Sequence, residues 1–191
     1  AKPIRYDSDY INRYRRLSET DAGKQINAFR IKWVLDHAGP RVSLLDYGSG
    51  DLTFLSLARL SHWPEAHGYD ICEDDLVKYA LHDLGHGSHS RHHAVCFWDS
   101  LEHLDNPMEA LALADAWVFV TIPIMPNSVN PARLPEWKHY KPGEHFWYFT
   151  RRGIVSFMRE AGFSMTDGSE AECEYGREDI ATFAFLRREI K

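Results

Sequence analysis

Two glycines and two acids are spaced so that they could hold a nucleoside. Residues 44–52 read LLDYGSGDL, which puts Gly48 and Gly50 in a turn just after Asp46. Glycine lets the backbone turn sharply and approach a ligand with no Cβ in the way. Asp70 lies 20 residues after Gly50, at the end of the next apolar run, where an acid accepts hydrogen bonds from both hydroxyls of a ribose. The pattern predicts a nucleoside-binding turn.

The glycine turn lacks the marks of two common nucleotide-binding loops. A dinucleotide-binding G-x-G-x-x-G would place its third glycine at Thr53, and a phosphate-binding loop would need G-K-[ST], which is absent. Asp46 and Asp51 would repel a pyrophosphate, whereas they attract a ligand that carries an ammonium and a sulfonium. These residues therefore favour S-adenosylmethionine over a dinucleotide.

Methyl transfer from a sulfonium is an in-line displacement, for which a protein aligns the reactants and excludes water. An O or N acceptor that is not already nucleophilic also needs a base. The candidate catalytic residues are Glu102, His103 and His145, with His139 as a further candidate base. Each also has a structural interpretation. His145 could fix its loop through a backbone hydrogen bond, and Glu102 and His103 could cap or pack the helix after them.

Apolar runs predict the elements that position these residues. Buried strands are predicted at residues 42–47, 67–71, 94–98, 117–122, 163–167 and 180–186. Helices are predicted at residues 8–20, 22–37, 52–60, 73–84, 105–114 and 151–161. Strands alternating with helices predict a doubly wound α/β fold with a mainly parallel sheet covered on both faces. The last two strands, joined by a polar loop without a helix, predict an antiparallel edge.

In open sheets of this kind, ligands bind beyond the carboxyl ends of the strands, at the switch point of the strand order. Residues 123–149 hold five prolines and several aromatic residues, and this pattern predicts a long ordered loop. Such loops are uncommon unless they are functional. We expect one domain, residues 1–191, with an N-terminal helical cap at 1–38 and a loop at 123–149 that covers the active site.

Several motifs together resemble class I S-adenosylmethionine-dependent methyltransferases. Residues 44–52 (LLDYGSGDL), 68–71 (GYDI) and 98–107 (WDSLEHLDNP) occur in the order and at the distances of that family's motifs. Within the family they are most similar to the small-molecule-type branch with D-x-L-E-H-x-x-x-P at the end of the fourth strand. Residues 143–150 (GEHFWYFT) are similar to the same branch, so the resemblance extends over nearly the whole chain.

The resemblance implies a set of cofactor contacts. The methionine portion and the cofactor backbone would lie against Asp46, Tyr47, Gly48, Ser49 and Gly50. Asp70 would hold the ribose, with Ile71 against the adenine. The sulfonium end would face Trp98, Asp99 and Ser100.

Two positions depart from the family pattern. The third glycine usual in the first motif is Leu52 here, which narrows the conformational freedom of the turn. The strand usual before residues 94–98 is very short or missing, because residues 86–93 read HGSHSRHH. The contact to the adenine edge is therefore left unassigned.

Five histidines raise the alternative of a metal site: His82, His86, His89, His92 and His93. Only one acid, Asp83, lies among them, and the run crosses a predicted helix end. A metal site needs fixed ligand geometry and supporting hydrogen bonds. The stretch is interpreted as a polar loop without a metal.

Composition limits the class of protein. The three cysteines are odd in number and form no C-x-x-C pair, so we expect no disulfide framework and a cytoplasmic, reducing location. No apolar run is long enough to span a bilayer, and the first ten residues are too polar for a secretory signal. Residues 1–32 hold eight Lys or Arg against four acids. That stretch could meet a phosphate-bearing substrate, but a solvated helix face is favoured.

We therefore expect a methyltransferase that uses S-adenosylmethionine, releases S-adenosylhomocysteine and acts on a small-molecule or tailoring acceptor. Nucleic acid is disfavoured as a partner because Asp99-Ser100-Leu101-Glu102 replaces the Asn/Asp-Pro-Pro-aromatic run that grips a flipped base, and because the net charge is −6. Two alternatives stay open: an enzyme that uses the same cofactor for other chemistry, such as propylamine transfer or cofactor cleavage, and a cofactor-binding module without activity. The acceptor and the oligomeric state are not determined.

Overall fold

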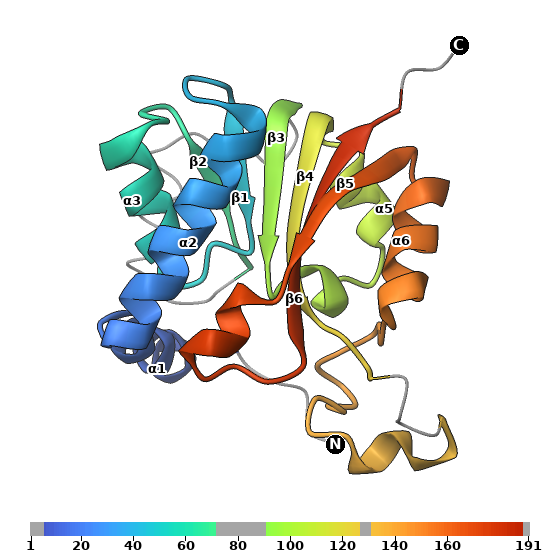
Figure 1. The fold of residues 1–191 in the computed structure, drawn as a ribbon. Helices are drawn as coiled ribbons and strands as arrows, with labels where there is room; N and C mark the ends of the chain where they lie inside the picture. Colours follow the sequence, from blue (N-terminus) through green and yellow to red (C-terminus); the bar gives the residue numbers. More distant parts are fainter. Residues whose placement is uncertain (1–5, 72–90, 127–130, 189–191) are drawn as a thin grey trace.

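A computed structural model describes residues 6–71, 91–126 and 131–188 of this chain. These residues form a six-stranded sheet with the strand order β2-β1-β3-β4-β6-β5 (Figure 1). The strands are β1 (Leu44–Tyr47), β2 (His67–Tyr69), β3 (His92–Trp98), β4 (Ala114–Pro123), β5 (Phe163–Ser169) and β6 (Ile180–Arg187). The first four pair in parallel, and β6 is antiparallel to β4 and β5. The predicted mainly parallel sheet with an antiparallel edge is confirmed.

Helices cover both faces of the sheet (Figure 1). The helices are α1 (Ser8–Ser18), α2 (Asp21–Ala38), α3 (Thr53–Ser61), α5 (Pro107–Leu111) and α6 (Arg151–Glu160). Within the described ranges, three 3-10 helices accompany them: η2 (Leu101–His103), η3 (Pro131–Glu136) and η4 (Ala171–Tyr175). Buried residues of α1, α2 and α3 belong to one hydrophobic cluster, and those of α5 and α6 belong to the other. The fold is therefore a three-layer α/β sandwich.

Strand residues alternate between these two clusters. Leu44 packs in the cluster of α1–α3, whereas its neighbour Leu45 packs in the cluster of α5 and α6. Cys96 and Phe97 of β3 divide in the same way. Because both faces are buried, the strands read as continuous apolar runs in the sequence.

The structure corrects where two predicted strands begin, how long one predicted helix is, and how the last two strands are connected. β3 begins at His92 and β4 at Ala114, because these two residues already pair across the sheet. The helix predicted at 105–114 is consequently only one short segment, α5. β5 and β6 are joined through η4, not by a loop without a helix. The predicted helix at 73–84 lies outside the described residues.

The strand order reverses between β1 and β3. The chain passes from β1 to β2 on one side and then returns to β3 on the other side of β1. Loops leaving β1 and β3 therefore diverge, and ligands bind in such crevices. Figure 1 shows the carboxyl ends of these strands at the lower edge of the sheet, where α1 and η4 also lie.

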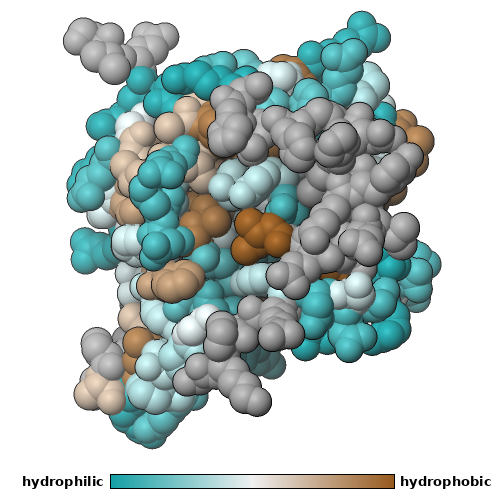
Figure 2. Space-filling model, turned by 180° about the vertical axis from the view of Figure 1, so that it is seen from behind, coloured by the Kyte–Doolittle hydropathy of each residue, from teal (hydrophilic) through white to brown (hydrophobic). Residues whose placement is uncertain are grey.

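The surface seen from behind is largely hydrophilic, with apolar side chains gathered near the centre of the view (Figure 2). Among the residues that the structure describes, no helix combines the length and the apolar character needed to cross a membrane.

Helices α1 and α2 approach each other closely at Gly23. Thr20 caps α2, and its Oγ1 accepts a hydrogen bond from the Gly23 amide at 3.1 Å. A Cβ at position 23 would lie only 2.2 Å from the main-chain oxygen of Leu17. The turn between the two helices therefore leaves no room for a side chain here.

We expect Gly23→Ala to destabilise the protein by about 1–3 kcal/mol, because overpacking against backbone outweighs the roughly 1 kcal/mol by which alanine favours a helix. Gln25→Ala, at an exposed position of the same helix, should stay within about 0.5 kcal/mol of the parent. Urea denaturation measures both. A Gly23→Ala protein at least as stable as the parent would contradict the close helix contact.

Candidate functional site

A cavity of about 990 Å³ opens at the carboxyl ends of β1 and β3. Its wall includes all the residues that the sequence analysis assigned to cofactor binding or catalysis: Asp46, Tyr47, Gly48, Ser49, Gly50, Asp70, Ile71, Trp98, Asp99, Ser100, Glu102, His103 and His145. Side chains from α1, α2 and residues 139–146 complete the wall. Segments far apart in the sequence therefore meet around one space.

The turn after β1 has the backbone conformation that glycine favours. Gly48 and Gly50 have φ of 86° and 52°, and Leu52 has φ of 67°. A left-handed conformation at a residue such as Leu52 costs about 1–2 kcal/mol, which explains why a glycine is usual there in the resembling family. The amides of Gly48 and Ser49 both donate to the Tyr69 oxygen, at 2.8 and 3.0 Å, and this ties the turn to β2.

Gly48 also lies against the segment after β3. A Cβ at this position would be 2.5 Å from the Cβ of Ser100. The Ser100 hydroxyl donates to the Tyr47 oxygen at 2.6 Å. The two loops that diverge from β1 and β3 are thus joined at their base, directly beneath the cavity.

Asp70 contacts the glycine turn itself. Its Oδ2 accepts a hydrogen bond from the Gly50 amide at 2.7 Å. Ile71, next in the chain, is 65% exposed and lies at the cavity wall. The turn and the downstream acid, 20 residues apart, therefore meet on one side of the cavity.

Asp46 is a buried acid with an unsatisfied atom. Only 1% of its surface is exposed, and among the described residues its Oδ1 has no hydrogen-bond partner. Burial raises the pKa of this carboxyl to about 8, and the positive charge of Arg30 opposes that shift. The cavity wall thus carries a polar atom that a cationic ligand group could satisfy.

Four charged side chains form an ionic network at the wall, and three of them, Arg30, Asp99 and Arg177, line the cavity. Arg30 of α2 bonds Asp99 Oδ2 at 2.9 Å and Glu172 Oε1 at 2.8 Å. Arg177 bonds Asp99 Oδ1 at 2.7 Å and Glu172 Oε2 at 2.5 Å. The Thr121 hydroxyl of β4 donates to Glu172 Oε1 at 3.2 Å. The network therefore connects α2, the end of β3, β4 and η4.

The network changes the interpretation of two residues. The sequence favoured a solvated helix face for the basic N-terminal stretch; this is wrong for Arg30, whose side chain is only 11% exposed and lies 5.1 Å from the ring centroid of Trp98. Burial alone would raise the pKa of Asp99, but Arg177 and Arg30 hold it well below its usual range. Asp99 therefore stays ionised and paired at the cavity wall.

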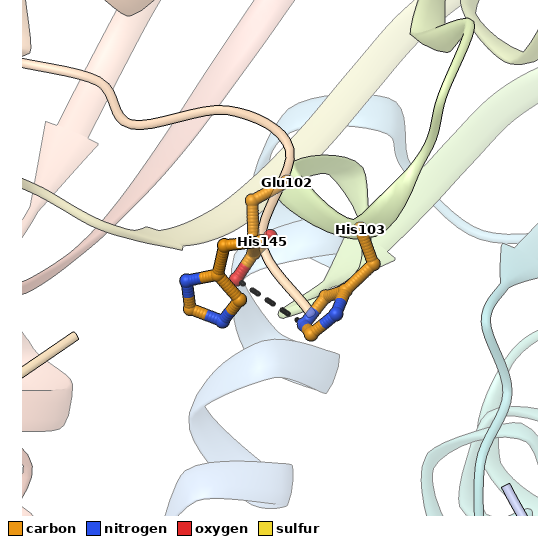
Figure 3. Close-up of side chains that lie close together, drawn as sticks. All are labelled: Glu102, His103 and His145. Carbon is orange, nitrogen blue, oxygen red and sulfur yellow. Dashed lines mark ion pairs between the residues drawn. The ribbon is translucent and has the colours of Figure 1, made fainter. Parts of the chain in front are cut away.

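Glu102, His103 and His145 form a compact cluster at the same wall (Figure 3). One ligand atom from each lies within 4.8 Å of the others. Glu102 and His103 belong to η2, while His145 comes from the segment after η3. The main-chain oxygen of Glu102 accepts from the amides of Phe146 and Trp147, at 2.9 and 3.3 Å. These backbone bonds hold the His145 segment against η2.

The cluster is buried, which changes its protonation. Burial raises the pKa of Glu102 well above its ordinary value, and the charge of Asp99 adds to this effect. Burial, together with the nearby His103, lowers the pKa of His145 to about 3. The pKa of His103 is also lowered by burial. At neutral pH both imidazoles are therefore uncharged.

The other histidines do not belong to this cluster, although His139 also lines the cavity. The Nε2 of His139 lies 2.9 Å from the Glu178 oxygen, so this ring contacts the segment before β6. His92 is buried in β3, which corrects its interpretation as part of a polar loop. His82, His86 and His89, and with them the unassigned adenine-edge contact, lie outside the described residues.

Aromatic residues of the N-terminal segment line the cavity and were not assigned a role from the sequence. The ring centroids of Tyr6 and Tyr10 are 5.0 Å apart, and those of Tyr10 and Tyr14 are 4.7 Å apart. The Tyr6 hydroxyl lies 3.3 Å from His103 Nδ1. Burial raises the pKa of Tyr6 to about 12. For this segment the sequence predicted only a helical cap at residues 1–38.

The chain matches a family model described as "Methyltransferase domain" over residues 6–167. No curated protein matches the sequence. Its fold is similar to that of magnesium protoporphyrin IX methyltransferase from Synechocystis PCC 6803 with bound S-adenosylhomocysteine, at 15% identity, 96% coverage of both chains and a TM-score of 0.66. It is also similar to 1,6-didemethyltoxoflavin-N1-methyltransferase from Burkholderia thailandensis (14% identity, 95% of this chain, 85% of that chain, TM-score 0.66). The [4+2]-cyclase SpnF shares the fold as well (13% identity, 88% and 84% coverage, TM-score 0.61).

The raised pKa of Asp46 makes stability depend on pH. The unfolded chain releases this proton near pH 4, whereas the folded protein keeps it until about pH 8. The contribution of Asp46 to stability therefore falls as the pH rises through this window. We expect Asp46→Asn to gain stability relative to the parent between pH 5 and pH 8, by at least about 1 kcal/mol.

Urea denaturation at pH 5, 6.5 and 8, without cofactor, measures this difference. Asp115→Asn is the matched control, because Asp115 is exposed on β4. Its difference from the parent should be the same at each pH. Parallel pH curves for Asp46→Asn and the parent would contradict the raised pKa.

Proposed function

Because this chain belongs to the methyltransferase-domain family, we propose that it is a class I enzyme that binds S-adenosylmethionine in the 990 Å³ cavity and transfers the methyl group to a small-molecule acceptor. The observation that carries this proposal is the contact between the glycine turn and Asp70 at the switch point of the sheet. S-adenosylhomocysteine is the other product.

The cavity fits this cofactor in size and in polar groups. Its volume lies at the upper end of the range for small-molecule sites, about 300–1,000 Å³. The partnerless Asp46 Oδ1 suits the ammonium of the methionine portion. Two of the structures with this fold contain S-adenosylhomocysteine or S-adenosylmethionine. The cofactor supplies a methyl group already activated on a sulfonium.

We assign the contacts along the cavity as follows. The methionine portion lies against Asp46, Tyr47, Gly48, Ser49 and Gly50, as these residues surround the turn. Asp70 holds the ribose, and Ile71 at the mouth lies against the adenine. Trp98, Asp99 and Ser100 form the wall at the sulfonium end, where Arg30 and Arg177 keep the Asp99 side chain in place.

The acceptor enters between the N-terminal helices and the segment 131–149. The proposal keeps the organisation that the sequence predicts. The chain forms one domain, in which residues 1–38 are a cap and residues 123–149 are the loop that covers the active site. Tyr6, Tyr10 and the covering loop exclude water from the reactants. Glu102, His103 and His145 are the catalytic candidates, since their side chains meet at one part of the cavity wall.

A small-molecule acceptor suits the site better than a nucleic acid. The cavity is concave, its wall includes aromatic rings, and the acidic side chains of the wall outnumber its Lys and Arg side chains. The chain carries a formal net charge of −6, which opposes binding to a polyanion. Product analysis with a methyl-labelled cofactor tests the reaction. A labelled product supports methyl transfer, whereas cofactor cleavage, or conversion of an acceptor without label, would contradict it.

We expect Asp70→Ala to weaken binding of S-adenosylmethionine and S-adenosylhomocysteine at least tenfold, a loss of about 1.4 kcal/mol, because the ribose and the Gly50 amide lose their acceptor. Isothermal titration calorimetry measures this change. Asp36→Ala, on the exposed side of α2, should bind as the parent does. If the parent chain binds neither ligand, both the assigned cofactor and the proposed enzymatic activity are contradicted.

Gly48→Ala should abolish measurable cofactor binding, because the new methyl group would meet Ser100 and close the base of the cavity. Gly39→Ala is a matched control. Gly39 also has a positive φ of 75°, but a Cβ there meets no atom within 4 Å. Both variants lose about 1–3 kcal/mol of stability from backbone strain, while only Gly48→Ala loses binding. Equal binding by the two would contradict the role of the turn.

A further inference from the structure

Glu102, His103 and His145 bring three potential metal-ligand atoms together. Their potential ligand atoms lie within 4.8 Å of one another, and His103 Nε2 is 3.9 Å from Glu102 Oε1. Glu102 is 1% exposed, and among the described residues its Oε2 has no hydrogen-bond partner. Figure 3 shows the three side chains converging from η2 and the covering loop. A buried carboxylate oxygen without a partner is costly unless a cation offsets it.

The donor set is specific in its chemistry. Two imidazole nitrogens and one carboxylate oxygen are a facial ligand set for first-row divalent cations, with positions left open for a substrate. Asp99, the nearby acid, is paired with Arg30 and Arg177, so it does not compete for the cation.

A supporting contact orients one of the rings. The Tyr6 hydroxyl lies 3.3 Å from Nδ1 of His103. When Nδ1 carries the proton and donates a hydrogen bond to the Tyr6 hydroxyl, the lone pair of Nε2 stays available on the side of Glu102. Metal-binding histidines are held by hydrogen bonds of this kind. Tyr6 comes from the segment before α1, so the N-terminal cap takes part in the arrangement.

We propose that Glu102, His103 and His145 bind one divalent first-row cation, and that the methyl acceptor binds this cation through a hydroxyl oxygen. The role in catalysis rests on the proposed function; the cation site itself does not. The bound hydroxyl releases its proton to solvent. Its oxygen then forms a bond to the methyl carbon, while the carbon–sulfur bond breaks and its electron pair stays on sulfur. The acceptor class is therefore a hydroxylated small molecule.

Metal titration of the whole chain, freed of metal with a chelator, tests the site without cofactor or acceptor. Electron paramagnetic resonance with Mn²⁺ and calorimetry with Zn²⁺ should each give one site per chain. Glu102→Gln and His145→Ala should weaken binding at least tenfold, with circular dichroism spectra unchanged. His139→Ala removes another imidazole of the same cavity and should bind as the parent does.

The outcomes separate this inference from the proposed function. No bound cation, or binding that Glu102→Gln and His145→Ala leave unchanged, overturns the site even where S-adenosylmethionine binds normally. Cation binding without cofactor binding overturns the proposed function and leaves the site. With labelled cofactor and hydroxylated acceptors, chelation should lower kcat/KM at least 100-fold and added Mn²⁺ should restore it. If chelation leaves turnover unchanged, the cation has no catalytic role, and a histidine is left as the candidate base.

Discussion

The reversal of strand order between β1 and β3 is the constraint on which the site depends. Because β2 and β3 lie on opposite sides of β1, the loops at the carboxyl ends of β1 and β3 diverge and leave a cavity between them. Hydrogen bonds join the loops at the base of that cavity: the turn amides donate to the Tyr69 oxygen, and the Ser100 hydroxyl donates to the Tyr47 oxygen. The sheet therefore supplies the space, and the glycine turn supplies close access to it.

The buried acids around this cavity differ in whether their carboxyl oxygens have hydrogen-bond partners. The ionic network satisfies each of its acids with two guanidinium groups, and Glu172 also receives the Thr121 hydroxyl. Removing one partner of such a network leaves an uncompensated buried charge and typically costs about 3–5 kcal/mol. Asp46 and Glu102 instead each keep a buried oxygen without a partner among the described residues. Both of these carboxyl groups belong to the cavity wall, where a bound ligand is able to complete them.

The N-terminal helices and residues 139–146 contribute side chains to the cavity wall. Arg30 of α2 pairs with Asp99 at the end of β3, and Tyr6 contacts His103. The amides of Phe146 and Trp147 donate to the main-chain oxygen of Glu102, so backbone bonds bring the neighbouring His145 to Glu102.

The sequence by itself determined the alternation of strands and helices, the mainly parallel sheet, and the turn with its acid, because these follow from local apolar patterns and from residues within one β-α-β unit. Leu52 shows a limit of this reasoning: its left-handed backbone was not evident until the turn was seen. Only the tertiary structure decided that Arg30 pairs with Glu172, 142 residues away, and that His145 meets Glu102 and His103. Such pairs carry no local spacing signal, since they form only when the assembled sheet brings distant segments to the same edge.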